Sequence, residues 1–202
     1  MDLEKGIYSQ RDEQGVINSR FEKNNGRFLE VGAYDPFTFS NTRKLYERGW
    51  SGVFVEPSPT CFSKLEAEYK DKDNAVLINA AVAPQCGILK FYDSQGDAIS
   101  SSDPAHVKKW ESGFNCTFIE IEVEAITWDK IFDDHGTDFD FINLDTESTN
   151  WELLQIFPFN RCKPQMFCIE FDDRLADMKL LLSNYGYKDI HTTGENLIFW
   201  RG

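Results

Sequence analysis

The sequence predicts a single α/β domain over residues 1–202, in which a mostly parallel sheet carries helices on its faces. Short apolar runs alternate with amphipathic segments along nearly the whole chain. The first two of these runs are each followed by acidic residues at or just beyond their ends, as at the ligand edge of an open α/β sheet. The length of 202 residues, of which 41% are hydrophobic, suits one domain with a substantial core.

The centre of the predicted fold is a strand–helix–strand unit. The apolar run Phe28–Val31 ends in a small-residue turn, and a second apolar run, Val53–Val55, follows. Between them Ser40 is placed to cap the N-terminus of a helix, and Gly49 is placed to end it. In parallel geometry both strands end at the same edge of the sheet, where we expect the binding site.

The remaining elements follow in order. Residues 1–26 are expected to form a helical lead-in, and Thr149 with Glu152 has the spacing of a capping box. Further helices are expected at 60–69, 127–132, 149–157 and 175–185. Further strands are expected at Ala75–Val82, Ile88–Tyr92, Phe118–Val123, Asp138–Asp145, Gln165–Phe171, Tyr187–His191 and Asn196–Trp200. Residues 93–117 are polar and show no period, which is typical of a substrate-binding loop or lid.

Composition excludes several classes of protein. A net charge of −13 argues against nucleic acid as a partner, because phosphate contacts need clustered Lys and Arg. The five cysteines are odd in number and lack C-x-x-C spacing, which favours a reducing compartment and therefore the cytoplasm. The absence of an apolar run near 18 residues predicts no membrane span.

The acids at the strand ends indicate the ligand. The turn after the first strand has one glycine, Gly32, where a dinucleotide fingerprint uses three. Glu30 and Asp35 would repel a pyrophosphate but suit a cationic ligand such as S-adenosylmethionine, and Glu56 is placed to accept its ribose hydroxyls. An NAD-type oxidoreductase, a non-catalytic donor-binding domain and, less favoured by the charge, a nucleic-acid methyltransferase remain alternatives.

The blocks YSQRDEQGVI, GRFLEVGAYDPFTFSNTRKLYERGWSGVFVEPSP, INAAVA, DFDFINLDTE and GENLIFWR resemble, in order, those of the FkbM family of S-adenosylmethionine-dependent methyltransferases. The resemblance implies the Rossmann-like class I methyltransferase fold, with seven strands in the order 3-2-1-4-5-7-6 and strand seven antiparallel. It also implies O-methyl transfer to a small-molecule or glycan acceptor, often a hydroxyl of a sugar or of a polyketide-derived natural product.

The resemblance also implies the cofactor site. The loop around the methionine end of the donor would comprise Glu30, Gly32, Ala33, Tyr34 and Asp35, with Asn41 helping to shape the pocket. The adenosine end would be held by Glu56, Pro57, Ser58, Asn79, Ala80 and Ala81. As plainer alternatives, Glu30 and Asp35 could be turn residues whose carboxylates accept backbone amides.

The same resemblance makes Asp145 and Glu147 the acidic pair beside the reacting methyl group. Asp145 is the first choice to take the acceptor's proton or orient the acceptor, and Glu147 the second, although Asp145 could simply cap the next helix. Alternatively the pair could share a divalent cation with Glu170 or Asn143. The family usually has glycine where this chain has Ser148, which puts the role of Glu147 in question.

Two residues of the long polar stretch complete the candidates. His106 could act as a base if this stretch closes over the site, although an ordinary loop histidine is the alternative. Trp110 could stack on the face of a sugar.

Overall fold

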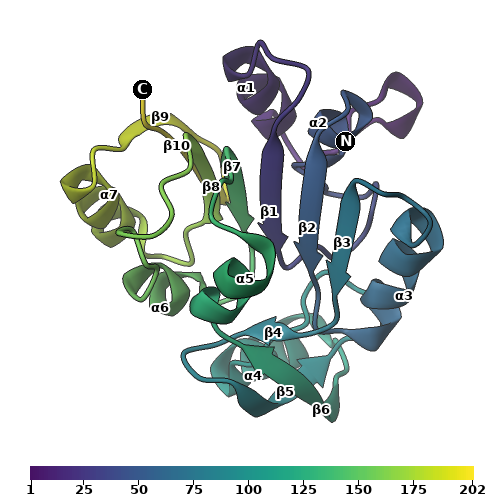
Figure 1. Cartoon of the computed structure of the whole chain (residues 1–202). Coiled ribbons are helices and arrows are strands. Elements are labelled where there is room, and N and C mark those ends of the chain that lie inside the picture. Colours follow the sequence, from purple (N-terminus) through teal and green to yellow (C-terminus); the bar gives the residue numbers. More distant parts are fainter.

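The computed structural model describes all residues from Met1 to Gly202 and contains a large and a small sheet (Figure 1). The strands of the large sheet are β1 (Arg27–Val31), β2 (Ser51–Val55), β3 (Ala75–Ile78), β7 (Phe141–Leu144), β8 (Met166–Glu170), β9 (Lys188–Thr192) and β10 (Asn196–Trp200). Their spatial order is β3-β2-β1-β7-β8-β10-β9, and β10 is antiparallel to both of its neighbours. Counted along this sheet alone, the order is 3-2-1-4-5-7-6, so the predicted topology is confirmed.

Helices cover both faces of the large sheet, because successive strand residues point to opposite faces. Phe28 packs in a cluster with residues of the helices α1 (Glu13–Arg20), α2 (Arg43–Glu47) and α3 (Pro59–Tyr69). Leu29, its neighbour on β1, packs in a second cluster with residues of α5 (Trp128–His135), α6 (Asn150–Gln155) and α7 (Leu175–Asn184). A 3-10 turn, η1 (Leu3–Lys5), precedes α1.

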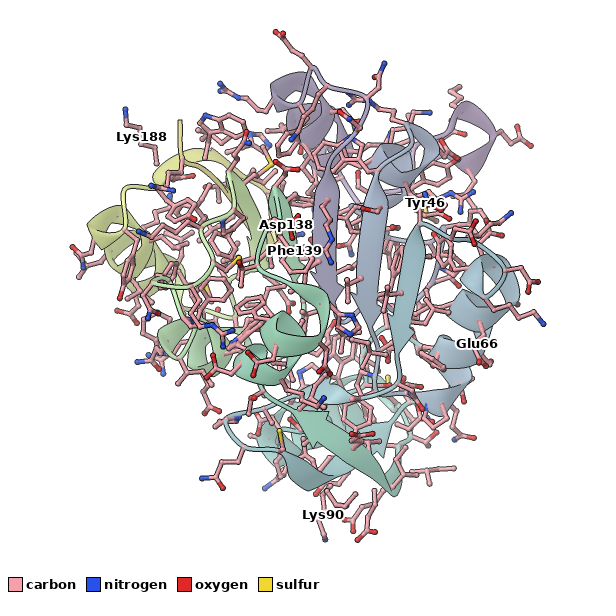
Figure 2. All side chains as sticks on the ribbon, in the orientation of Figure 1. Tyr46, Glu66, Lys90, Asp138, Phe139 and Lys188 are labelled. Carbon is pink, nitrogen blue, oxygen red and sulfur yellow. The ribbon has the colours of Figure 1, made fainter.

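The small sheet lies beyond the carboxyl ends of the large-sheet strands, below the arrowheads of β1 to β3 in Figure 1. It consists of β4 (Ala81–Val82), β5 (Gly87–Asp93) and β6 (Ile119–Ile126) in the order β4-β6-β5. Together with α4 (Pro104–Phe114) it forms what we call the cap. Lys90 of the cap points outward to solvent and pairs with Glu120 (Figure 2).

The strand expected at Ala75–Val82 is wrong as a single element. β3 ends at Ile78 and the chain enters the small sheet at Ala81. In the break, Asn79 Nδ2 donates hydrogen bonds to the carbonyl oxygens of Glu56 and Pro57. Because the Asn79 side chain hydrogen-bonds to the carbonyl groups after β2, β3 ends just before this residue although the apolar sequence continues to Val82.

The expectation of an irregular stretch over residues 93–117 is also corrected, because α4 lies within it. Asp103 caps this helix by accepting from the Ala105 amide, and Pro104 begins it. The sequence pattern hides the helix because only His106 and Val107 of its side chains are buried.

The capping box expected at Thr149 does not form either. The Thr149 hydroxyl donates to Thr146 instead of accepting from the first turn of α6.

None of the helices has the length and apolar character needed to cross a bilayer.

Candidate active site

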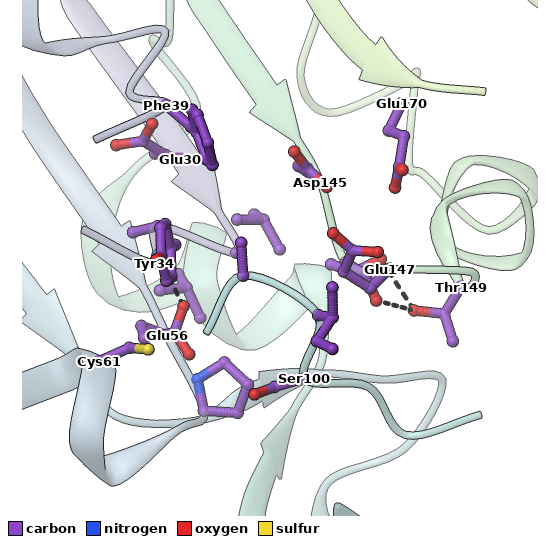
Figure 3. A pocket seen from close by; sticks show the side chains of 18 of the residues that line it. Glu30, Tyr34, Phe39, Glu56, Cys61, Ser100, Asp145, Glu147, Thr149 and Glu170 are labelled. Carbon is purple, nitrogen blue, oxygen red and sulfur yellow. Dashed lines mark hydrogen bonds between the residues drawn. The ribbon is translucent and has the colours of Figure 1, made fainter. Parts of the chain in front are cut away.

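A cavity of about 500 Å³ lies between the carboxyl edge of the large sheet and the cap (Figure 3). Its floor comes from the turns after β1, β2, β7 and β8, and its roof comes from the cap. The volume falls in the range of small-molecule sites, and the position is the usual one for ligands of open α/β sheets.

The turn after β1 depends on Gly32. Gly32 has φ +79°, and a Cβ atom there would lie 1.6 Å from the carbonyl oxygen of Asp145. The amides of Gly32 and Ala33 both donate to Val55 O, which fixes the turn against the end of β2. Only glycine permits this approach of the β1 turn to the β7 end, so the cavity floor depends on it.

Glu56 at the end of β2 is buried, with 5% of its surface exposed. Its Oε2 accepts from the Tyr34 amide and its Oε1 from the Ser58 amide, each at 2.8 Å. Burial raises the pKa of Glu56 to about 7, against the opposing effect of these two amides. The carboxyl group is therefore held in one orientation with lone pairs left to receive further donors.

Glu30 on β1 is also buried, and the Thr42 hydroxyl donates to its Oε2 at 2.7 Å. Burial raises the pKa of Glu30 to about 8, so the group is mostly neutral at pH 7 unless a cation lies beside it. Close by, Asn41 Nδ2 donates to Asn143 Oδ1 at 3.0 Å, which ties the start of α2 to β7. A cation placed here would favour ionisation of Glu30.

Most of the predicted cofactor residues meet at the cavity. Those that line it are Glu30, Gly32, Ala33, Tyr34, Asn41, Glu56, Pro57, Ala80 and Ala81.

Three other predicted cofactor residues do not line the cavity. Asp35 accepts from the amides of Phe37 and Thr38 and pairs with Lys64, as its plainer alternative proposed. Ser58 caps α3 and donates to Asp93, whereas Asn79 holds the carbonyls after β2. These three residues hold the backbone behind the cavity lining and do not form part of the lining itself.

Asp145, Glu147 and Glu170 form an acidic cluster. Each offers one carboxylate oxygen, and these atoms lie within 4.8 Å of one another. Figure 3 shows the three carboxyl groups turned toward a common space. Sheet register explains the meeting: Leu144 pairs with Ile169, so Asp145 and Glu170 follow side by side at the ends of β7 and β8.

Burial and the repulsion of nearby carboxylates act on all three carboxyl groups of this cluster. They raise the pKa of Asp145 to about 6, the pKa of Glu170 to about 12, and the pKa of Glu147 well above its usual value. Asn143 of the predicted alternative ligand set lines the cavity, but its side chain is bonded to Asn41.

Ser148, which stands where the family usually has glycine, has a backbone conformation typical of glycine. Glu147 and Ser148 have φ values of 51° and 81°, the left-handed region that glycine adopts without strain. The Ser148 side chain lies 2.8 Å from His106 Nδ1, and His106 Nε2 lies 3.1 Å from Ile99 O. A carbonyl only accepts, so neutral His106 carries its proton on Nε2 and accepts from Ser148 at Nδ1.

His106 is thus bonded on both ring nitrogens and does not line the cavity. Burial lowers its pKa, which keeps it neutral at pH 7. This geometry disfavours His106 as a base and gives it a positioning role, in which it ties α4 to the turn after β7.

The sequence did not reveal several lining residues. Trp110 lines the cavity as expected, but Lys109 beside it was not singled out. Further unforeseen lining residues come from the chain start, from the segments before and after α4, and from the end of the β9–β10 turn with the start of β10. They include Gln10, Asp97, Ala98, Ile99, Ser100, Cys116, Glu195 and Asn196. Acidic side chains strongly outnumber basic ones, since Lys109 is the one basic side chain in the lining.

The 3-2-1-4-5-7-6 sheet with its cavity at the carboxyl edge has the Rossmann-like class I methyltransferase fold. The sequence profile of the methyltransferase FkbM domain matches residues 30–188. The chain therefore belongs to the FkbM methyltransferase family and is an S-adenosylmethionine-dependent methyltransferase.

Solved structures agree with this fold. A precorrin-6y C5,15-methyltransferase from Geobacter metallireducens superposes with a TM-score of 0.53 at 14% identity, covering 100% of this chain and 95% of that one. Fibrillarin, in its complex with Nop5p, gives a TM-score of 0.51 at 12% identity, covering 96% and 81%. The METTL16 methyltransferase domain gives a TM-score of 0.51 at 10% identity, covering 94% and 64%. A comparison with curated protein sequences gives no match.

Proposed function

We propose that this enzyme transfers the methyl group of S-adenosylmethionine to a hydroxyl oxygen of a sugar, glycan or natural product. The observation that carries the proposal is the acidic cluster of Asp145, Glu147 and Glu170 in a cavity that Glu30, Gly32 and Glu56 also line. A cationic donor and a proton-yielding acceptor would meet between these two groups of carboxyls.

The donor would lie across the ends of β1 and β2. Glu56, held by the Tyr34 and Ser58 amides, would accept the two ribose hydroxyls. Ala80 and Ala81 would contact the adenine, since their small side chains leave room at the cavity wall. The positively charged methionine end would lie between Gly32 and Glu30 and would lower the pKa of Glu30.

The acceptor would lie between the turn after β7 and the cap. In the transfer, an oxygen lone pair of the acceptor forms the C–O bond, and the C–S electron pair moves to sulfur, leaving S-adenosylhomocysteine. The hydroxyl proton would pass to Asp145, whose pKa of about 6 leaves it mostly ionised at pH 7. Glu147 remains the second choice for this proton, and Trp110 would stack on the acceptor.

The alternatives find less support. An NAD-type oxidoreductase would need a pyrophosphate in a cavity with many acidic side chains and Lys109 as its one basic side chain. The same charge and the net charge of −13 argue against nucleic acid as acceptor.

The cysteines carry no disulfide, in keeping with the cytoplasmic location proposed from the sequence.

The test combines donor binding with transfer. Calorimetry with S-adenosylhomocysteine should give one site, and labelled donor with a panel of sugars and polyketide-type alcohols should identify an acceptor. Asp145→Ala should lower the transfer rate about 10²- to 10⁴-fold while S-adenosylhomocysteine affinity stays near that of the wild type. Wild-type turnover in this variant would show that Asp145 does not take the proton.

A further inference from the structure

The acidic cluster has no Lys or Arg partner. Among the residues that line the cavity only Lys109 is basic, and no ion pair joins it to Asp145, Glu147 or Glu170. His106 Nε2 lies 3.7 Å from Glu147 Oε2, but this nitrogen is bonded to Ile99 O. Oδ1 of Asp145 is buried and has no hydrogen-bond partner in the protein. Buried carboxylates without a partner are costly unless they bind a cation or keep protons.

The spacing of the cluster fits a single ion. Oxygen ligands of a six-coordinate Mg²⁺ lie about 2.1 Å from the metal, so opposite ligands are about 4.2 Å apart, and for Ca²⁺ slightly more. The ligand oxygens of Asp145, Glu147 and Glu170 lie within 4.8 Å of one another. Three side chains from two adjacent strand ends can therefore reach one ion.

A buried amide orients the cluster from behind. Asn150 is fully buried, and its Nδ2 donates to Glu170 Oε2 at 2.9 Å and to Asp172 Oδ2 at 2.7 Å. Its Oδ1 accepts from the Thr146 amide at 2.8 Å, so both ends of the amide are occupied. One oxygen of Glu170 is thus fixed and the other is left for the common space, as in the outer shell of many metal sites.

The chemistry of the donors selects the ion. All three ligands are carboxylates, with no sulfur and no imidazole among them, which suits Mg²⁺ or Mn²⁺ better than Zn²⁺. Three protein ligands would leave about three positions of an octahedral ion for water or for acceptor oxygens. An ammonium group would also fit this space, but its single charge would offset only one of three carboxylates.

We propose that Asp145, Glu147 and Glu170 bind one Mg²⁺ or Mn²⁺ ion at which the acceptor hydroxyl is held. The purpose of this ion rests on the proposed methyl transfer, in which it would lower the pKa of the bound hydroxyl. Because a carboxylate has two oxygens, Asp145 can bind the ion with one and keep the other for the acceptor's proton. An acceptor with two neighbouring oxygens would occupy two of the open positions.

The test measures the ion directly, using Mn²⁺ and the loss of its free electron paramagnetic resonance signal. Wild type should bind one Mn²⁺, and Glu170→Gln should weaken this binding at least about tenfold, since one of three charged ligands is lost. Glu122→Gln, which removes an exposed carboxylate on β6, is the matched control and should bind as wild type. Glu170→Gln should stay folded, because glutamine keeps the bond from Asn150.

Two results would overturn the ion site: no Mn²⁺ bound at millimolar concentration, or equal affinity in wild type and Glu170→Gln. A third would assign the cluster to an ammonium group, namely transfer to a primary amine that persists undiminished in EDTA. S-adenosylhomocysteine calorimetry on the same samples separates the two proposals. Donor binding without Mn²⁺ binding removes only the ion, whereas Mn²⁺ binding without donor binding removes the proposed function.

Discussion

The two sides of the cavity are built in different ways. On the β1–β2 side, each carboxyl group accepts hydrogen bonds from the protein: Glu56 from the Tyr34 and Ser58 amides and Glu30 from Thr42. On the β7–β8 side, distant segments meet: His106 contacts Ser148, and Asn150 contacts Glu170. The first side is complete within the protein, whereas the second leaves an oxygen of Asp145 without a partner.

This difference suggests a division of work. The β1–β2 side is preorganised, because each of its carboxyl groups has hydrogen-bond donors within the protein. The β7–β8 side has three carboxyl groups that need protons or a cation, and it lies against the cap. In the proposed function, variation at α4 and at the β7–β8 side would change the acceptor, while Glu30 and Glu56 would continue to hold the donor.

Gly32 joins the two sides, so its substitution should have the largest effect. In Gly32→Ala the new Cβ would collide with Asp145 O, and the positive φ would add strain. We expect a loss of several kcal/mol in the free energy of unfolding together with loss of S-adenosylhomocysteine binding. Denaturant unfolding and calorimetry measure both.

Gly15→Ala on α1 is the control for this change. Its Cβ meets no atom within 4 Å, so its stability should equal or exceed that of the wild type. A stable, donor-binding Gly32→Ala protein would mean that the two sides are not joined at this contact.

Glu30→Gln tests the β1–β2 side through the pH dependence of stability. An unfolded chain ionises Glu30 near pH 4.5, whereas the folded protein does so near pH 8. Between these values the folded state binds more protons, so the stability of the wild type falls as pH rises. Glu30→Gln should remove this loss, on the order of 4 kcal/mol by pH 8.

Thermal or denaturant unfolding at pH 5 and pH 8 gives the answer for both proteins. Parallel pH profiles for wild type and variant would exclude Glu30 as a buried titrating group.

Glu56→Gln should affect donor affinity more than stability. The amide nitrogen of the glutamine would face the Tyr34 or Ser58 amide, two donors against each other. We expect S-adenosylhomocysteine to bind about 10- to 100-fold more weakly, with KM for the donor raised accordingly. Glu66→Gln on the outer side of α3 (Figure 2) removes an exposed carboxylate and should leave affinity unchanged.

Ser148 should give the smallest effect and sharpens the view of the β7–β8 side. Ser148→Gly relieves the backbone at φ 81° and loses the bond to His106, so unfolding free energy should change by less than about 1 kcal/mol. Ser148→Ala keeps the strain and also loses the bond, so it should be less stable than Ser148→Gly. Equal stability of the two variants would show that the backbone conformation does not matter here.

The sequence by itself determined the order of the large-sheet strands and of the helices that flank them, the parallel edge and the acids at the ends of β1, β2 and β7, because these follow from periodicity and from neighbours in the chain. It also carried the family motifs that imply the sheet order. It placed Asp35, Ser58 and Asn79 at the cofactor, whereas their side chains bond to backbone groups and do not line the cavity. Spacing does not distinguish a turn side chain that faces the cavity from one that bonds to the nearby backbone.

Only the tertiary structure decided what the cap does and which acids meet. α4 has few buried side chains, so its pattern is weak, yet packing brings Lys109 and Trp110 to the cavity. Glu170 reaches Asp145 because β8 pairs with β7 in register, and Ser148 keeps its left-handed backbone while His106 lies beside it. Such contacts join segments 20 or more residues apart, and hydrophobic periodicity describes only residues near one another in the chain.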